Sequence, residues 1–364
     1  MKWYPAYIFL LLILTSCAKK EQPVTKAEAV AYSEKIKALI KNRDAEIFNK
    51  ILNDELFAGE VVKAAGEEGS RSLKEQVKKT LHNRNLSNEL YSSIGKDGLY
   101  EFLKQYEKNG HQHLIFRLYG NGGLNYHDYE LVKYDDKISA KDLYIYLTGE
   151  NLSRTMAQMY SATLKQTNGS NTLAGQYSKN LSKLKSLYSK KEFAAAKAIF
   201  DKLPSALKKE KTFQLINLQI TSEMDNETYT EALKEFEDLF KNDASAQLPL
   251  FDYYFLRADY KKSLQVINQI DTTVQDPLLD YYRGLIYTQM KEDKTAVVYL
   301  EKLYKNMPYF ETGVLELMAN YIEMQRYNET NALIASYKKN RSFNQARLSD
   351  MQDHYPDVAA NVNW

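Results

Sequence analysis

The sequence has little cysteine, no surplus of one charge and no familiar catalytic motif. Cys17 is the only cysteine among 364 residues, so no disulfide can form within the chain and no paired-cysteine motif exists. The Gly-x-Ser-x-Gly motif of a nucleophilic serine is also absent. Lys and Arg number 49 against 47 Asp and Glu, a net charge of +2. This balance argues against a nucleic-acid partner, because such proteins gather positive charge on one face.

The start of the chain lacks an apolar run long enough to span a membrane. The uncharged stretch from Trp3 to Ala18 is shorter than the roughly 20 apolar residues that a bilayer requires. A lysine at position 2, a compact core of IFLLLIL and small residues after it are typical of a secretory signal peptide. We place this signal at residues 1–16. The alternative is an uncleaved anchor in which Cys17 is buried and inert.

The residues before the cysteine carry a more specific signal. Leu14-Thr15-Ser16-Cys17 resembles the bacterial lipobox, an apolar residue and two small ones before a cysteine. The resemblance implies cleavage before Cys17, attachment of a diacylglycerol to its sulfur and acylation of the new amino terminus. A lipidated thiol could not act as a nucleophile. Residues 17–26 would then be a lipidated tether that holds the protein in the bacterial cell envelope, facing the periplasm or the exterior.

The remaining 348 residues are enough for two or more domains. Residues 27–107 read as several helices, including 27–40, 43–57 and a shorter helix at 98–108. After these, residues 111–136 form two strand-like runs around Gly120-Asn121-Gly122-Gly123, a composition typical of a hairpin turn. A phosphate-binding loop is excluded there, since it needs a following helix and usually a lysine.

A third strand-like run begins at Asp142, and a helix follows at 150–164. Helices followed by an antiparallel meander predict an α+β domain over residues 27–164. The order of elements resembles that of nuclear-transport-factor-like and cystatin-like rolls, which implies a curved sheet wrapped around a helix. Residues 165–176 are the predicted linker to the next domain.

The alternation of side chains along a strand predicts which face of the sheet each histidine of this domain occupies. If Tyr119 pairs with Leu124, His127 lies on the apolar face, where we expect a packed histidine with one hydrogen-bonded nitrogen. The opposite face gathers a polar group, with His111 nearby: His113, Arg117, Asp128 and Glu130.

Two histidines and a carboxylate could ligate zinc, but Arg117 would oppose a cation and would pair more naturally with Asp128 or Glu130. We therefore predict no metal, no cofactor and no catalytic residue, and a sheet face that is either solvated or docked onto a helix.

The carboxy-terminal half contains a repeat. Five segments align on a small residue, with gaps of 36, 31, 33 and 34 residues. The small residues are Ala196, Ala232, Ser263, Ala296 and Thr330. Large residues follow four and seven positions later, which places all three on one face of a helix. Apolar positions upstream predict a second helix in each unit, so each unit is a helical hairpin.

The period resembles that of the tetratricopeptide repeat, about 34 residues per hairpin. The best match is Pro277–Pro308, which carries Gly284, Tyr287 and Ala296 in register. The unit at 213–244 departs most. The resemblance covers residues 177–343, followed by a tail at 344–364. The predicted fold is an α+β amino-terminal domain followed by an all-α solenoid of tetratricopeptide-like helical hairpins.

Stacked hairpins of this kind present a concave groove lined by their first helices. The family pattern implies these groove positions: Asp252, Phe255, Tyr281, Leu285 and Gln289. The alternative is that they only pack between hairpins or are solvated. The leading hypothesis is a lipid-anchored envelope adaptor or scaffold that binds an unidentified protein or peptide through this groove. The alternatives are a small-ligand or enzymatic pocket in the α+β domain, or an α+β domain that merely caps the solenoid.

Overall fold

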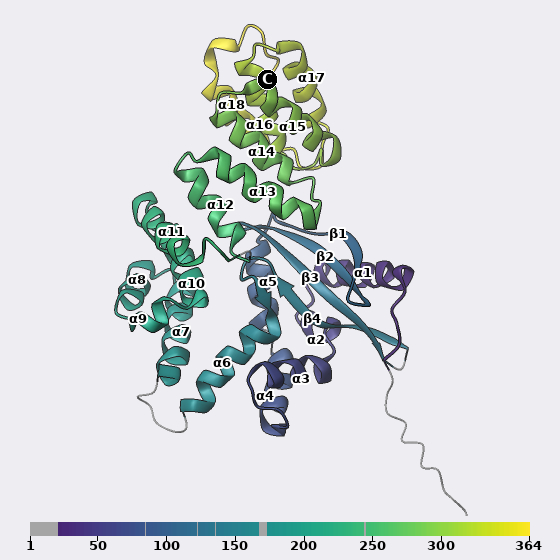
Figure 1. The fold of residues 1–364 in the computed structure, drawn as a ribbon. Coiled ribbons are helices and arrows are strands. Elements are labelled where there is room, and N and C mark those ends of the chain that lie inside the picture. Colours follow the sequence, from purple (N-terminus) through teal and green to yellow (C-terminus); the bar gives the residue numbers. More distant parts are fainter. Residues whose placement is uncertain (1–20, 84, 122, 135, 167–172, 244) are drawn as a thin grey trace, which may run out of the picture.

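The computed structural model describes residues 21–83, 85–121, 123–134, 136–166, 173–243 and 245–364. Within these residues, helices and an antiparallel sheet form an amino-terminal α+β domain, and a run of helices forms a solenoid (Figure 1). The predicted fold class is confirmed. Cys17 and the predicted signal peptide lie outside the described residues, as does the middle of the predicted linker.

Short helices precede the sheet. They are α1 (Lys26–Lys41), α2 (Ile47–Ile51), α3 (Asp54–Ala64), α4 (Arg71–Leu81) and α5 (Asn85–Ile94). The helix predicted at 27–40 is confirmed as α1, which begins with a capping box between Thr25 and Glu28. The single helix predicted at 43–57 is wrong. It breaks at Asn53, whose side chain caps α3 and whose backbone N–H donates to Ala140 O at 2.8 Å.

The sheet is a five-stranded antiparallel meander in the described residues, with strands in sequence order. The strands are β1 (Leu99–Lys108), β2 (His111–Gly120), β3 (Gly123–Tyr134), β4 (Lys137–Ile145) and β5 (Glu150–Asn151). The predicted pairing of Tyr119 with Leu124 is confirmed, and with it the pairing of Phe116 with His127. The hairpin prediction therefore set the correct face for every residue of β2 and β3.

The short helix predicted at 98–108 is wrong, because these residues form β1. Tyr and Phe are favoured in strands, and β1 pairs with β2 along its whole length, with an irregularity between Phe102 and Lys104. Gly98 permits the tight approach to α5 that starts the strand, since an added Cβ would lie 1.8 Å from Ile94 O. Strand pairing with β2 therefore overrides a local pattern that resembles a helix.

The two faces of the sheet are buried against different partners. Leu114, Phe116 and Tyr129 share a core with the helices of the α+β domain. Ile115, Leu124 and Tyr126, on the opposite face, share a core with the solenoid. The expectation that this opposite face docks onto helices is confirmed, and the solvated alternative is excluded for these residues.

Helix α6 (Leu152–Gln166) leads from β5 to the helical hairpins of the solenoid. The hairpins in the described residues are α7–α8 (Leu173–Ser189, Phe193–Asp201), α10–α11 (Lys211–Ser222, Asn226–Phe240), α12–α13 (Gln247–Leu256, Tyr260–Val274), α14–α15 (Leu279–Gln289, Asp293–Asn306) and α16–α17 (Glu311–Glu323, Tyr327–Tyr337). The short helix α9 (Ser205–Lys208) separates the first two. All five predicted hairpins are confirmed, including the divergent unit at 213–244.

The small residues used to align the repeats are buried in all five hairpins, with at most 4% of their surface exposed. The large residues four positions later are equally buried, as helix–helix packing requires. Leu239, seven positions after Ala232, departs from the pattern and is 37% exposed. The divergent second unit therefore keeps the close approach of its two helices and loses one apolar contact.

A left-handed residue joins the two helices in four of the hairpins. These residues are Lys191, Ala258, Lys291 and Gln325, with φ between 56° and 61°. Each lies five positions before the small aligned residue of its unit. The chain reverses direction there in the conformation that glycine adopts most easily, although none of the four is glycine.

Both ends of the described chain join the fold. Gln22 forms a β-bridge with Lys133 and Val24 is buried, so the last residues of the predicted tether lie against the sheet. At the other end, α18 (Gln345–His354) and the 3-10 turn η1 (Pro356–Val358) follow the last hairpin. Leu348 and Val362 are buried in the solenoid core, so the predicted tail covers the end of the solenoid.

Candidate functional site

The predicted polar group lies on the outer sheet face, which is the face that packs against the solenoid. In the structure its residues divide into two parts. Arg117 is 2% exposed and forms ion pairs with Glu101 of β1 and Asp276 of the loop between α13 and α14. The expected pairing of Arg117 with Asp128 or Glu130 is wrong. Glu101 lies opposite Arg117 in the sheet register, and docking of the solenoid brings Asp276 to its other side. Glu101 was not predictable while β1 was assigned to a helix, and Asp276 was not predictable without the docking of the two domains.

Arg117 belongs to a network that joins the two domains. The Tyr126 hydroxyl donates to Asp276 Oδ2 at 3.0 Å, and the Tyr309 hydroxyl donates to Glu101 Oε1 at 3.0 Å. A buried guanidinium between two carboxylates holds both in place, because breaking such a pair leaves an unpaired charge. The network therefore fixes the sheet against the solenoid.

The second part of the polar group surrounds Asp128. The Tyr106 hydroxyl donates to one carboxylate oxygen of Asp128 at 2.5 Å, and Nδ1 of His113 lies 3.0 Å from the other. Glu130 lies beside them, with its Oε1 2.5 Å from Nδ1 of His111. The predicted association of His113, Asp128 and Glu130 is thus observed, without Arg117.

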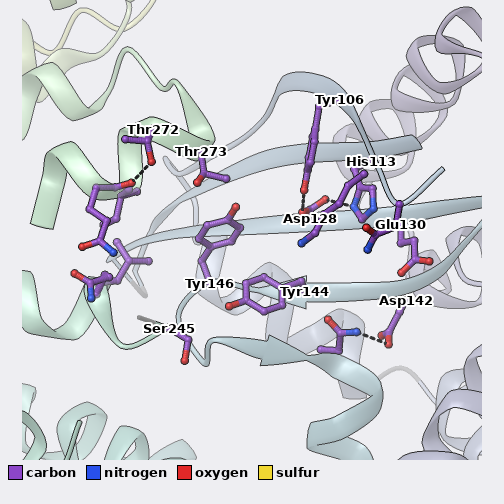
Figure 2. A pocket seen from close by; sticks show the side chains of 17 residues that line it. Tyr106, His113, Asp128, Glu130, Asp142, Tyr144, Tyr146, Ser245, Thr272 and Thr273 are labelled. Carbon is purple, nitrogen blue, oxygen red and sulfur yellow. Dashed lines mark hydrogen bonds and ion pairs between the residues drawn. The ribbon is translucent and has the colours of Figure 1, made fainter. Parts of the chain in front are cut away.

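These three residues line a cavity of about 530 Å³ between the outer sheet face and helices α12 and α13, which we call the interface cavity (Figure 2). Strand β4 and the residues after it add Asp142, Tyr144 and Tyr146, while the solenoid adds Leu248, Gln269 and Thr272 among others. Burial raises the pKa of Asp142 to about 6, although it accepts hydrogen bonds from Ser153 and Asn151. Both domains therefore build this cavity.

His113 lines the interface cavity, whereas His127 does not. Among the described residues, no group of three or more His, Cys, Asp or Glu side chains is arranged to hold a metal ion. His127 lies on the other face of the sheet, buried, with Nδ1 2.9 Å from the Tyr100 hydroxyl. Burial lowers its pKa to about 4, so it stays neutral. The prediction of a packed histidine with one hydrogen-bonded nitrogen is confirmed.

The residues of the predicted groove lie on α12 and α14, the first helices of neighbouring hairpins. Asp252 and Gln289 are exposed, while Phe255, Tyr281 and Leu285 are partly exposed. Phe255 and Tyr281 also pack against the solenoid core. All five therefore keep some solvent contact, which a binding surface requires.

Asp252 is electrostatically unusual among these residues. Its Oδ2 accepts a hydrogen bond from the Tyr229 hydroxyl at 3.1 Å, and no cation pairs with it in the described part of the chain. Desolvation by the surrounding protein raises its pKa to about 6, although its side chain keeps contact with solvent. Asp252 is thus a carboxylate that has lost part of its hydration without gaining a positive partner.

Aromatic rings connect Phe255 to the sheet. Phe255 stacks on Phe251 at a centroid distance of 5.6 Å, and Phe251 meets the edge of Tyr282 at 5.1 Å. Farther along, Phe310 contacts both Tyr281 and Tyr119 of β2, each at 5.3 Å. Sequence reasoning missed Tyr229, Tyr282 and Phe310. The high tyrosine content, 29 residues, was a signal that could have drawn attention to Tyr229 and Tyr282, but not to Phe310.

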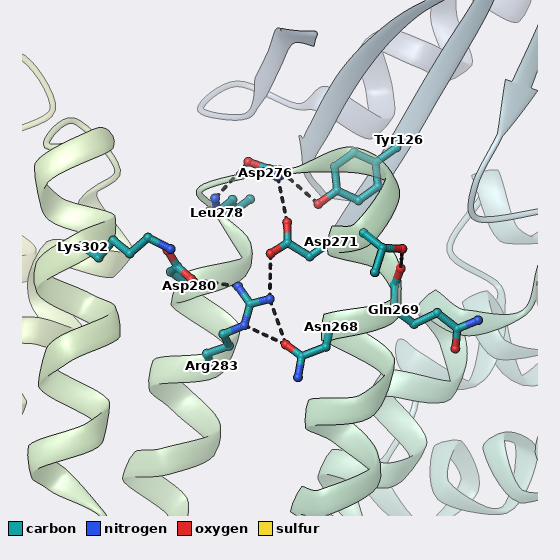
Figure 3. A network of polar contacts seen from close by, with 10 residues as sticks. Tyr126, Asn268, Gln269, Asp271, Asp276, Leu278, Asp280, Arg283 and Lys302 are labelled. Atoms are coloured by element: carbon teal, nitrogen blue, oxygen red, sulfur yellow. Dashed lines mark hydrogen bonds and ion pairs between the residues drawn. The ribbon is translucent and has the colours of Figure 1, made fainter. Parts of the chain in front are cut away.

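A second ion-pair network fixes α14 in the solenoid, and the Asp276 N–H, which donates to Asp271 at 3.1 Å, joins it to the network of Arg117 (Figure 3). Arg283 donates to Asp271 of α13 at 2.7 Å and to Asp280 at 2.8 Å, and Lys302 of α15 lies 2.8 Å from Asp280. This network links α14 to both neighbouring helices. It holds the helix that carries Tyr281, Leu285 and Gln289 in position.

No protein family, curated protein or solved structure matches the chain. Within the described residues, no helix combines the length and the apolar character needed to cross a bilayer.

Proposed function

We propose that the protein is a lipid-anchored adaptor of the bacterial cell envelope that binds a partner segment across α12 and α14. The observation that carries this proposal is Asp252, a partly desolvated carboxylate without a positive partner among the described residues. Phe255 and Leu285 offer apolar contact on the same two helices. This combination favours a partner segment that carries Lys or Arg beside an aromatic or aliphatic side chain.

The energetic reason is that the folded protein has already removed part of the hydration of Asp252, as its raised pKa indicates. A cation that arrives there gains a charge-assisted hydrogen bond and offsets the desolvation of the carboxylate. Neighbouring rings such as Phe255 also attract a cation through their π faces. An apolar side chain of the partner would supply the remaining binding energy, since a few buried side chains provide most of the energy of such interfaces.

The lipid on Cys17 is the proposed means of localisation. Because Gln22 is already paired with Lys133, five residue steps separate Cys17 from the folded domain. An extended chain covers at most about 18 Å in that length. The α+β domain would therefore lie close to the membrane, with the solenoid presented by it.

Peptide binding tests the proposal. Fluorescence anisotropy should show that labelled peptides with Lys or Arg beside Phe or Leu bind the protein, whereas Glu-substituted versions do not. Asp252→Lys should weaken this binding about tenfold or more, the equivalent of about 1.4 kcal/mol. Asp238→Lys is the matched control, because Asp238 is an exposed aspartate on α11. Equal loss in both variants, or equal binding of acidic peptides, would contradict the proposal.

A further inference from the structure

The interface cavity is a second candidate site, independent of the predicted groove. Its volume of about 530 Å³ falls within the range of roughly 300–1,000 Å³ that is usual for small-molecule sites. The walls belong to both domains: strands β1 to β5 on one side, and α12 and α13 with the loop before α12 on the other. A molecule bound here would touch residues more than 100 positions apart in the sequence, such as Tyr146 and Gln269.

The lining is polar and aromatic. Its amide and hydroxyl side chains are Asn109, Asn151, Ser245, Gln247, Gln269, Thr272 and Thr273. Only Leu248 and Ile270 are aliphatic. Amides and hydroxyls can each donate and accept, so this lining matches a ligand with many groups of the same kind.

Three tyrosine rings in the interface cavity offer flat aromatic surfaces to a ligand. Tyr144 and Tyr146 meet edge to face at 5.3 Å, and Figure 2 shows both rings in the middle of the cavity. The hydroxyl of the third, Tyr106, is held by Asp128. An aromatic face favours contact with apolar C–H groups, while the hydroxyls of Tyr144 and Tyr146 can form hydrogen bonds with a ligand.

The carboxylates of the cavity already have partners. Asp128 is held by Tyr106 and His113, while Glu130 lies near His111 and Lys141. Asp142 accepts hydrogen bonds from the backbone and side chain of Ser153. Asp128 and Glu130 keep further lone pairs for a ligand hydroxyl, whereas the acceptor sites of Asp142 are already filled by four donors from Leu143, Asn151 and Ser153. All three carboxylates are therefore stabilised by groups of the protein itself. The cavity therefore favours a neutral ligand over a charged amine.

We propose that the interface cavity binds a neutral saccharide, with a sugar ring against Tyr144 or Tyr146. A sugar ring has an apolar C–H face that can lie against the tyrosine. Its hydroxyl groups can form hydrogen bonds with Asp128, with Gln269 and with the other amides. Because both domains contact the ligand, its binding also stabilises the docked arrangement of the sheet and solenoid.

A glycan array of neutral mono-, di- and oligosaccharides, probed with the full-length mature protein, tests this directly. The strongest glycan is then titrated by calorimetry beside choline, spermidine and arginine. We expect a glycan to bind and to raise the melting temperature. Gln269→Ala, on the exposed surface of α13, should weaken binding at least about tenfold, and so should Tyr146→Ala. Tyr146→Phe should retain most of the affinity because the ring remains.

Asp252→Lys separates this proposal from that of the groove. It should leave glycan affinity unchanged while it weakens binding of basic peptides about tenfold or more. If no glycan binds to protein whose fold is verified by circular dichroism, the saccharide proposal fails, whatever the peptide result. Preferential binding of choline, spermidine or arginine would also overturn it, as it would identify a cation site.

Discussion

At the scale of single residues, the ionised Asp252 side chain lowers the stability of the folded protein, and the same side chain is proposed to bind the partner. Its carboxyl has a pKa of about 6 in the folded protein, above its ordinary value near 3.8. The folded state therefore holds the proton more tightly than the unfolded chain does. The contribution of Asp252 to stability is greatest below about pH 4 and is lost as the pH rises through 6.

Replacing Asp252 by Asn should remove this cost. We expect Asp252→Asn to raise the free energy of unfolding by about 1 kcal/mol at pH 7.5, a value reduced for the solvent exposure of the side chain, and to leave it nearly unchanged at pH 4. Urea unfolding at both pH values measures the difference. Asp238→Asn is the control and should change stability by less than about 0.5 kcal/mol at either pH. A loss of stability at pH 7.5 would argue against a desolvated Asp252.

Arg117 differs from Asp252 because it is a buried charge that has a carboxylate partner on each side. Arg117→Met should lower the free energy of unfolding by about 3 kcal/mol or more, because Glu101 and Asp276 lose their shared cation inside the domain interface. Guanidinium unfolding measures this loss. Arg326→Met, which removes only partly exposed pairs with Glu301 and Glu329, should cost less than about 1 kcal/mol. Equal effects of the two substitutions would contradict the assigned role of Arg117.

At the scale of elements, the left-handed residues between paired helices offer a direct test of hairpin geometry. Ala258→Gly should stabilise the protein by about 0.5–1 kcal/mol, since φ is 56° at this position and glycine adopts that conformation without strain. The control, Gln265→Gly on the exposed surface of α13, should destabilise it by about 1 kcal/mol. Thermal unfolding compares the two. Destabilisation by both would show that Ala258 is not in a left-handed turn.

Local patterns predicted some elements well and others poorly, for physical reasons. The β2–β3 register followed from one turn, because Gly120 and Gly123 fix the pairing and every later residue alternates from there. The hairpins followed from the spacing of small residues such as Ala196 and Ala296, since close helix packing depends on them. Strand β1 was missed because its conformation depends on pairing with β2, which the local sequence does not encode.

The candidate sites were only partly predictable for a related reason. His113, Asp128 and Glu130 share one sheet face, so strand alternation alone brought them together. Gln269 and Thr272 join them only through docking of the solenoid, and Asp276 reaches Arg117 across 159 positions of the sequence. No periodicity within a domain could indicate how the two domains face each other.

At the scale of the whole molecule, the proposed lipid anchor would hold the folded domain near the membrane. Cys17→Ser should release the protein from the membrane fraction into the soluble fraction, because the lipid would have no sulfur to bind. Fractionation of cells followed by immunoblotting measures this, and circular dichroism should show an unchanged fold. A variant that stays in the membrane fraction as the wild type does would contradict lipid anchoring. Ser16→Ala, which keeps a small residue before the cysteine, is the control and should remain anchored.

The surface around Asp252 is proposed to bind a partner in the cell envelope. Site-specific photo-crosslinking in intact cells tests this binding most directly, with p-benzoylphenylalanine in place of Phe255 and, as a control, in place of Val298, which is 62% exposed on α15. We expect one discrete crosslinked protein from position 255, none from position 298, and loss of the product when Asp252→Lys is added. Equal crosslinking at both positions, or a product from position 255 that survives Asp252→Lys unchanged, would contradict the proposed binding.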